Sequence, residues 1–278
     1  MNEARASRLG EFALKMDERA SFYQQAVREF IHNKSSSILV CGGGPLDKYI
    51  FESLSFKDVT ISNLDIRMGG KQFYPYSWKY EDLESLSFSA ESFDYVVVHA
   101  SLHHTFSPHR ALTEMYRVAK IGILVLEARD SLTMRVMEKC GLTQSYETTA
   151  VYYSDCIEGG VNNTGIPNYV FRWTEREVEK AIRSYAPYNN PKISFKYGTA
   201  FPCTAEREIG GWIKVLFLRV IRPMYWLFTK VFPKQQNLFA FYIDKSTTSH
   251  SRFPWLDFDE RERKFSFNRK WGEQRFKN

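Results

Sequence analysis

The chain has 278 residues, of which 44% are hydrophobic and 25% charged, and a formal net charge of +6. This length suits one α/β domain with additions, and the hydrophobic fraction can supply a full core. The four cysteines lie far apart, with no CxxC pair and no Cys/His cluster, so we expect neither a disulfide framework nor a bound metal. The charged first residues do not resemble a signal peptide, and we expect a cytoplasmic protein.

Residues 7–32 alternate apolar and charged side chains in a way that predicts one or two amphipathic helices, placed to close over a bound ligand. The next element is an apolar run that ends in three glycines, Ile38 to Gly44. Glycine permits φ > 0 and a close approach of ligand to backbone. The helix expected over Pro45 to Ser53 would present free N–H groups to that ligand. The alternative is a tight turn without a ligand.

A second strand-like run, Val59 to Leu64, is followed by Asp65, about 20 residues beyond the glycines. A carboxylate at this place accepts hydrogen bonds from ribose hydroxyls in nucleotide-binding α/β folds. The alternative is an aspartate that caps the next helix. The dinucleotide fingerprint G-x-G-x-x-G fails, because its last position falls on Asp47, so a nicotinamide cofactor is disfavoured.

The rest of the chain continues the alternation of strands and helices. The expected strands are Phe93 to His99, Ile123 to Leu126, Lys192 to Tyr197 and Leu238 to Ile243. The expected helices are Pro108 to Ala119 with Ser107 as N-cap, Leu132 to Lys139 ended by Gly141, and Thr174 to Tyr185 with a Thr174–Glu177 capping box. Residues 145–173 are loop-like.

Three segments, which follow one another in the same order as in the family, resemble motifs of class I S-adenosylmethionine-dependent methyltransferases. ILVCGGGPLDKYI resembles their first motif and NLDI the second, and residues 81–128 resemble the small-molecule group that carries Leu-His-His. The resemblance implies a doubly wound, mostly parallel seven-stranded sheet of the Rossmann-like type, with N-terminal helices and a helical insertion before the last strand. It also implies S-adenosyl-L-methionine as cofactor and methyl transfer to a small-molecule, sugar or lipid-linked acceptor, which we expect to occur at oxygen.

The resemblance also implies roles for individual residues. The glycine turn would line the amino-acid end of the cofactor, Asp65 would hold the ribose with Ile66 on the adenine, Asp82 and Leu83 would meet the adenine edge, and Ala100 would lie near the sulfonium. The predicted cofactor-binding residues are therefore Cys41, Gly42, Gly43, Gly44, Asp65, Ile66, Asp82, Leu83 and Ala100.

The first motif departs from the family pattern, with Val40 in place of an acid and Leu46 in place of the third glycine. Ser87 stands where the family usually has a proline, and the pair Ile121-Gly122 stands where it usually has Pro-Gly before the fifth strand. Two alternatives therefore stay open. One is a catalytically degenerate methyltransferase fold that serves as a binding or scaffold protein, and the other is a nicotinamide-dependent oxidoreductase.

Three histidines follow the fourth strand, next to the expected sulfonium. A hydroxyl acceptor must lose a proton, and imidazole suits that step near neutral pH, so His103, His104 and His99 are the candidate catalytic residues. Loop-packing is the alternative role for the Leu-His-His pair. The candidate substrate-binding residues are Arg129, Tyr152, Tyr153 and Asn162.

We expect a helical cap at residues 1–35, a methyltransferase domain at 36–245 with an insertion at about 206–234, and a basic aromatic tail at 246–278. The segment Gly210 to Lys234 is too charged to span a bilayer. Core packing is its default interpretation. Its aromatic and basic residues also permit a peripheral membrane contact or a partner interface. Nucleic acid is a disfavoured partner, because the positive charge is spread along the chain.

Overall fold

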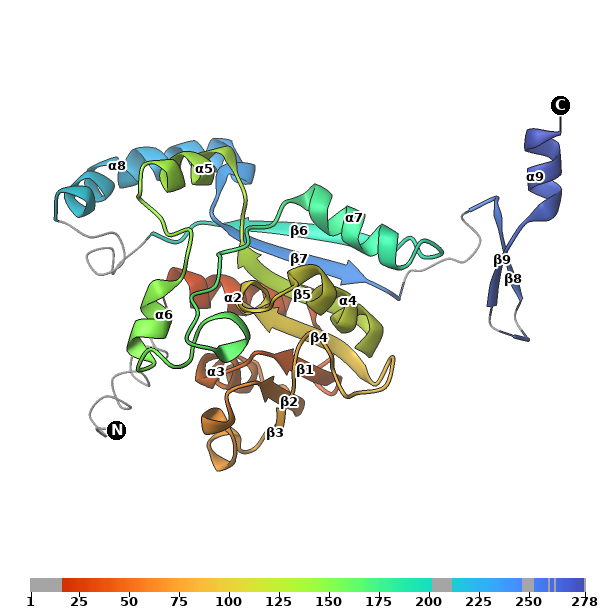
Figure 1. Cartoon of the computed structure of the whole chain (residues 1–278), viewed down its shortest axis with the longest axis horizontal. Helices are drawn as coiled ribbons and strands as arrows, with labels where there is room; N and C mark the ends of the chain where they lie inside the picture. Colours follow the sequence, from red (N-terminus) through yellow and green to blue (C-terminus); the bar gives the residue numbers. More distant parts are fainter. Residues whose placement is uncertain (1–16, 202–211, 247–252, 260, 263, 278) are drawn as a thin grey trace.

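The computed structural model describes residues 17–201, 212–246, 253–259, 261–262 and 264–277. Its main sheet has seven strands in the order β3-β2-β1-β4-β5-β7-β6 (Figure 1). The strands are β1 (Ser37–Cys41), β2 (Asp58–Asn63), β3 (Ser77–Tyr80), β4 (Phe93–His99), β5 (Ala119–Ala128), β6 (Lys192–Gly198) and β7 (Leu238–Asp244). Strands β1 to β5 are parallel, and β7 runs antiparallel to β5 and β6. This confirms the predicted doubly wound sheet.

Helices cover both faces of the sheet, which explains why its strands read as continuous apolar runs. The helices are α2 (Glu18–Phe30), α3 (Pro45–Ser53), α4 (Pro108–Val118), α5 (Leu132–Lys139), α6 (Thr148–Tyr153), α7 (Glu175–Tyr185), α8 (Trp212–Val231) and α9 (Arg269–Phe276). Short 3₁₀ turns are η1 (Ile66–Met68), η2 (Lys71–Phe73), η3 (Leu102–His104), η4 (Val161–Asn163) and η6 (Pro233–Gln235). One core packs α4 and α7 on the sheet, and the other packs α2 and α3 on the opposite face.

The predicted helix ends are confirmed where side chains cap them. The Ser107 hydroxyl accepts a hydrogen bond from the Arg110 amide at 3.3 Å, and α4 begins at the next residue. Thr174 and Glu177 form the predicted reciprocal capping box of α7. Gly141 follows α5 with φ +64°, a conformation that favours glycine at a helix end.

Helix α2 belongs to the core of the sheet. Its carboxylate N-cap, Asp17, accepts hydrogen bonds from the Arg19 and Ala20 amides. Its buried side chains are Ala20, Phe22, Tyr23, Ala26 and Val27. The predicted helical region before Asp17 lies outside the described residues. Because its first turn reaches the carboxyl ends of β4 and β5, α2 also contributes Arg19 and Phe22 to the site described below.

Two predictions about irregular segments were incomplete. Residues 145–173 were expected to be a loop, but they contain α6 and η4. The basic aromatic tail, for which no helix or strand was predicted, forms the hairpin β8 (Leu256–Asp259) and β9 (Lys264–Phe267), followed by α9. The ring of Phe265 stacks on Tyr188, with 4.9 Å between centroids. These elements have only three to eight residues, so their apolar periodicity is too brief to predict a helix or a strand.

The default interpretation of α8 as a core helix was wrong for one side of the helix, while Thr229 on the other side is buried. Val220, Met224 and Leu227 are 71%, 70% and 61% exposed. The opposite side of the helix holds the contacts, with Ile221 packed near Met137 and Leu142. The start of the expected insertion, residues 206–211, lies outside the described residues. Among the helices that the structure describes, none has both the length and the apolar character that a membrane crossing requires.

Candidate active site

The glycine turn lies at the carboxyl end of β1, in the middle of the parallel strands. Gly42 has φ +60°, and a Cβ added there would lie 2.5 Å from the Cβ of Ser101. The Ser101 hydroxyl donates a hydrogen bond to the Gly42 carbonyl at 3.1 Å. The turn is therefore tied to the loop after β4, and its first glycine is required by backbone geometry. Cys41, one residue earlier, is buried, and this burial raises the pKa of its thiol.

Asp47 accepts a hydrogen bond at the amino end of α3. The Gly44 N–H donates to the Asp47 carboxylate at 2.8 Å, and the Tyr23 hydroxyl donates to the same side chain at 2.8 Å. Burial raises the pKa of Asp47 from its ordinary value. Asp47 therefore satisfies one backbone donor of the turn from within the protein.

Asp65 follows β2 and caps the turn η1, so the predicted structural alternative is part of its role. The Arg67 guanidinium donates two hydrogen bonds to its carboxylate, at 2.8 and 2.7 Å. These hydrogen bonds hold the pKa of Asp65 below its usual value. Arg67 also forms an ion pair with Glu158. Ile66, between the two charged residues, is 73% exposed, so its side chain is available to a planar ring.

The remaining predicted cofactor residues follow β3 and β4. Asp82 lies two residues beyond the end of β3 and accepts a hydrogen bond from the Glu84 amide at 2.9 Å, while Leu83 is buried. Ala100 follows β4 with φ +52°. Four neighbouring strands thus place Gly42, Asp65, Asp82 and Ala100 at one edge of the sheet. This juxtaposition of a glycine turn, two carboxylates and an exposed apolar side chain fits an adenosine cofactor.

A cavity of about 190 Å³ lies beside this edge, above the carboxyl ends of β4 and β5. It is closed on one side by α2 and on the other by the segment that follows α5. The lining residues are Arg19, Phe22, His99, Ala100, His103, Leu126, Glu127, Ala128, Met134, Thr143, Gln144, Glu147, Val170, Arg172, Asn237, Leu238 and Phe239. Ala100 belongs to both the cofactor edge and the cavity, so a molecule in the cavity is adjacent to the predicted cofactor site.

His103 occupies a buried network of acids in this cavity. Its Nδ1 lies 2.6 Å from Glu127 Oε2, and Glu127 Oε1 accepts the Leu102 N–H at 2.7 Å. Its Nε2 lies 3.3 Å from Glu147 Oε2. Burial alone would lower the pKa of His103, but the two glutamates raise it to about 10. Burial would likewise raise the pKa of Glu147, but the adjacent histidines hold it well below its usual range.

The other two histidines differ from His103 in their surroundings. His104 Nε2 lies 3.2 Å from Glu147 Oε2, and its side chain is partly exposed. His99 stacks on Tyr23, with 4.5 Å between ring centroids and 11° between planes. Burial lowers the pKa of His99, and the nearby carboxylates of Asp47 and Glu127 only partly offset this effect. At neutral pH His99 is therefore the uncharged imidazole of the cavity.

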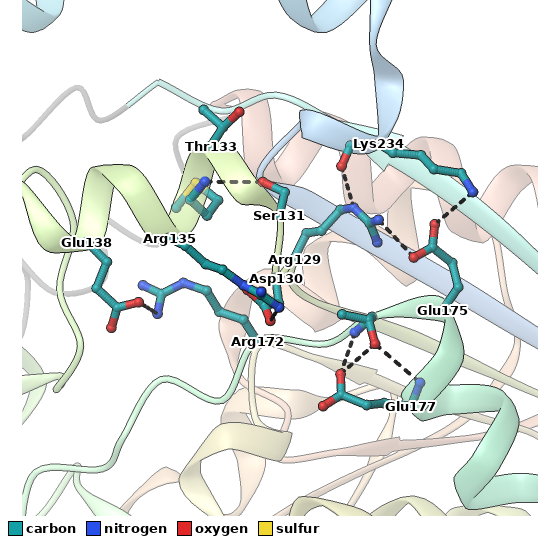
Figure 2. Close-up of polar contacts among 12 residues, drawn as sticks. Arg129, Asp130, Ser131, Thr133, Arg135, Glu138, Arg172, Glu175, Glu177 and Lys234 are labelled. Atoms are coloured by element: carbon teal, nitrogen blue, oxygen red, sulfur yellow. Dashed lines mark hydrogen bonds and ion pairs between the residues drawn. The ribbon is translucent and has the colours of Figure 1, made fainter.

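Arg129 lies outside the cavity, which corrects its expected place among substrate contacts. Figure 2 shows its guanidinium directed to Lys234 and Glu175. Its Nε donates to the Lys234 carbonyl at 2.7 Å, and its Nη2 lies 2.8 Å from Glu175. The side chain is 6% exposed and also lies over the rings of Tyr197 and Phe239. Arg129 therefore ties the end of β5 to the start of α7.

The other predicted substrate residues lie on the segment that closes the cavity, but they do not line it. Tyr152 and Tyr153 are exposed side chains of α6, and Asn162 adopts φ +47° within η4. The cavity is lined instead by Gln144, Glu147 and Arg172 from this part of the chain. The sequence carried no spacing signal for these three, because they come from irregular backbone and reach the site only through the tertiary fold.

The sheet order and the glycine turn at this edge resemble those of class I methyltransferases. Residues 40–126 match the family described as Methyltransferase domain. No curated protein matches the chain in sequence.

Solved structures agree with the domain match. A methyltransferase chain from a Haloferax volcanii complex with the Trm112 methyltransferase activator has a TM-score of 0.51 and 13% identity, over 82% of this chain and 90% of that one. A SAM-dependent methyltransferase from Thermotoga maritima has a TM-score of 0.51 and 17% identity, over 87% of this chain and 97% of that one. Identities this low show a shared fold alone. The match over residues 40–126, together with this fold, supports a class I SAM-dependent methyltransferase with S-adenosylmethionine as its cofactor.

Proposed function

We propose that this enzyme methylates a hydroxyl oxygen of a small-molecule, sugar or lipid-linked acceptor bound in the cavity above β4 and β5. The observation that carries the proposal is the position of Ala100, which belongs both to the cofactor edge of the sheet and to the cavity wall. S-adenosylmethionine, when bound, supplies a methyl group that its sulfonium already activates. The protein has to orient the acceptor, and orientation contributes up to about 7–11 kcal/mol to such reactions.

The cofactor contacts in this proposal come from the edge of the sheet. Asp65 accepts hydrogen bonds from the ribose hydroxyls, and the exposed Ile66 packs on the adenine. Asp82 and the Leu83 amide meet the adenine edge. The backbone of Cys41 to Gly44 faces the amino-acid end, where Gly42 provides the tight turn. Asp65 is the assignment that is easiest to test. Arg67 donates to both of its oxygens, so the ribose hydroxyls would share these oxygens with Arg67.

His99 is the proton acceptor of the proposed reaction. It lines the cavity next to Ala100, and its lowered pKa keeps it unprotonated at neutral pH. Its stacking on Tyr23 fixes the plane of the imidazole. His103 is unsuited to this role, since its two glutamate neighbours hold it in the charged form. A general base of this kind contributes about 10²–10⁴-fold to rate.

Titration with S-adenosylmethionine followed by a methyl-transfer assay tests the proposal. We expect calorimetry to give one cofactor site per chain. With a radiolabelled methyl group and a panel of hydroxyl-bearing sugars, lipids and metabolites, label should appear in an oxygen-linked methyl group. Cofactor binding without transfer to any hydroxyl would contradict the acceptor assignment. Absence of cofactor binding would favour the scaffold alternative.

A peripheral membrane contact is proposed for α8. The exposed residues Val220, Met224, Leu227 and Val231 follow at intervals of four, three and four, so about 100° per residue places them on one stripe. Arg219 and Lys230 lie about a quarter turn from the stripe, on one flank. An apolar stripe beside basic residues is typical of helices that lie in an anionic membrane surface.

A further inference from the structure

Three side chains with metal-binding atoms converge at the cavity wall. His103 and His104 come from η3, and Glu147 immediately precedes α6. Glu147 Oε2 lies 3.3 Å from His103 Nε2 and 3.2 Å from His104 Nε2. All three donor atoms lie within 4.8 Å of one another. From the sequence we expected no metal, because the chain has no CxxC pair and no Cys/His cluster.

These separations fit coordination to one ion. Two ligand atoms that each lie about 2.0–2.1 Å from a tetrahedral zinc ion are about 3.3 Å apart. Both histidine–glutamate separations have this value within about 0.1 Å. Two imidazole nitrogens and one carboxylate oxygen form the ligand set of many catalytic zinc and non-haem iron sites, which keep further positions open.

The surrounding residues orient the ligands in the way that metal sites require. Glu127 lies 2.6 Å from His103 Nδ1, so this nitrogen keeps its proton, while a bound ion would displace the proton that Nε2 shares with Glu147 in the metal-free chain. Glu127 has a fully buried side chain and is itself fixed by the Leu102 amide. Asn168, which is 2% exposed, donates to Glu147 Oε2 at 3.2 Å and restrains that carboxylate. Carboxylate–histidine pairs of this kind recur behind metal ligands.

We propose that His103, His104 and Glu147 bind a divalent transition-metal ion, with zinc favoured by the donor set and with open positions facing the cavity. Magnesium and calcium suit the site poorly, because both prefer oxygen ligands. His103 and Glu147 line the cavity wall, so an open position is accessible to an acceptor oxygen. The ion would lower the pKa of an acceptor hydroxyl bound to it. This last role rests on the proposed methyl transfer, whereas metal binding does not.

Metal binding to the full-length protein tests the inference. After dialysis against a chelator, the wild type should bind one zinc ion per chain in calorimetry without any cofactor present. Co²⁺ in place of zinc should give visible absorption bands of a nitrogen–oxygen site and no thiolate charge-transfer band, which excludes the exposed Cys140 and Cys156 as ligands. Glu147→Gln and His104→Ala should each weaken zinc binding by at least tenfold.

The control is His32→Ala, which removes an exposed histidine far along the chain from the cluster and should leave zinc binding unchanged. The inference is overturned if the wild type binds no ion, or if Glu147→Gln and His104→Ala bind zinc as tightly as the wild type. If either variant fails to fold, the Co²⁺ spectrum of the wild type tests the metal site, because the absence of nitrogen–oxygen bands would overturn the inference. Zinc binding without methyl transfer would contradict only the proposed function, and full methyl transfer by a metal-free chain would contradict only the role of the ion in activating the acceptor hydroxyl.

Discussion

The carboxylate of Asp65 and the guanidinium of Arg67 form two parallel hydrogen bonds, of 2.8 and 2.7 Å, at the carboxyl end of β2. Asp65 is the residue assigned to the cofactor ribose. Arg67 is 44% exposed and also pairs with Glu158 from the segment that closes the cavity. Arg67 therefore links the predicted cofactor site to the segment that closes the cavity. Removal of Asp65 and removal of Arg67 are expected to change cofactor affinity in opposite directions.

Asp65→Ala is expected to weaken S-adenosylmethionine binding by at least tenfold. A hydrogen bond to a charged group contributes about 1.5–3 kcal/mol, and about 1.4 kcal/mol corresponds to tenfold in affinity. Calorimetry provides the measurement, and Asp58→Ala, at the exposed opposite end of β2, is the control. Equal affinity of a folded Asp65→Ala protein would remove Asp65 from the cofactor site.

Arg67→Ala is expected to act in the opposite direction. Its side chain competes with ribose hydroxyls for the two oxygens of Asp65, and an exposed ion pair contributes about 0.2–1 kcal/mol. Cofactor affinity should therefore rise by up to about fivefold. Glu158→Gln should not raise it, because this change leaves Arg67 paired with Asp65. A fall in affinity would mean that Arg67 itself holds the cofactor.

Two glycines of the turn should respond differently to added side chains. Gly42→Ala places a Cβ 2.5 Å from Ser101 at a φ of +60°, so we expect a loss of stability. The positive φ alone costs about 1–2 kcal/mol. Gly44 has an extended backbone with φ −141°, so Gly44→Val should keep its melting temperature and lose cofactor affinity. Melting curves and calorimetry separate the two effects, and full affinity in Gly44→Val would make this turn purely structural.

Most strands of the sheet and the helix ends could be predicted from the sequence, because the signals for them are local. Ser107, Thr174 and Gly141 mark helix ends by their own chemistry, and the apolar runs between them have the length of buried strands. The cofactor edge was also predictable, because residues that follow parallel strands necessarily meet at one edge. The positions of Asp65 and Ala100 could be predicted from the ends of the preceding strands alone.

The cavity was less predictable, because its walls come from segments distant in sequence. Glu147 meets His103 and His104 only after the irregular segment folds back over η3, and no periodicity encodes that path. Arg129 was misplaced for the opposite reason. Its position directly after β5 follows from the sequence. The direction of its side chain depends on Glu175 and Lys234, which are distant in the sequence and could not be predicted to lie nearby.

The rate of methyl transfer should depend on the protonation of His99. Burial lowers its pKa below 6.5, and the charged or titratable groups around it are Asp47, Glu127, Arg19 and Asp17, with Tyr23 stacked on the ring. The uncharged form is the base, so kcat/KM should be flat near pH 7 and fall as the pH drops below the lowered pKa.

His99→Gln should reduce kcat by about 10²–10⁴-fold and abolish this acidic limb. His109→Gln serves as the control, because His109 packs on Phe171 and Trp173 outside the cavity lining. A pH profile of the variant that still shows the same acidic limb would assign the titration to another group and exclude His99 as the base.

The stripe on α8 gives the last prediction, which concerns binding to anionic membranes. The protein should co-sediment with phosphatidylcholine vesicles that contain phosphatidylserine, and salt should weaken binding because it screens the basic flank. The combined replacement Val220→Ser, Met224→Ser and Leu227→Ser should abolish co-sedimentation at an unchanged melting temperature, since these side chains are 61–71% exposed. Ile157→Ser with Ile166→Ser removes two equally exposed apolar groups elsewhere, and should bind like the wild type. A lower melting temperature in the α8 variant would instead assign the stripe to a packing role. Wild-type protein that ignores these vesicles would exclude the membrane contact and leave soluble sugars and metabolites as the acceptors to test.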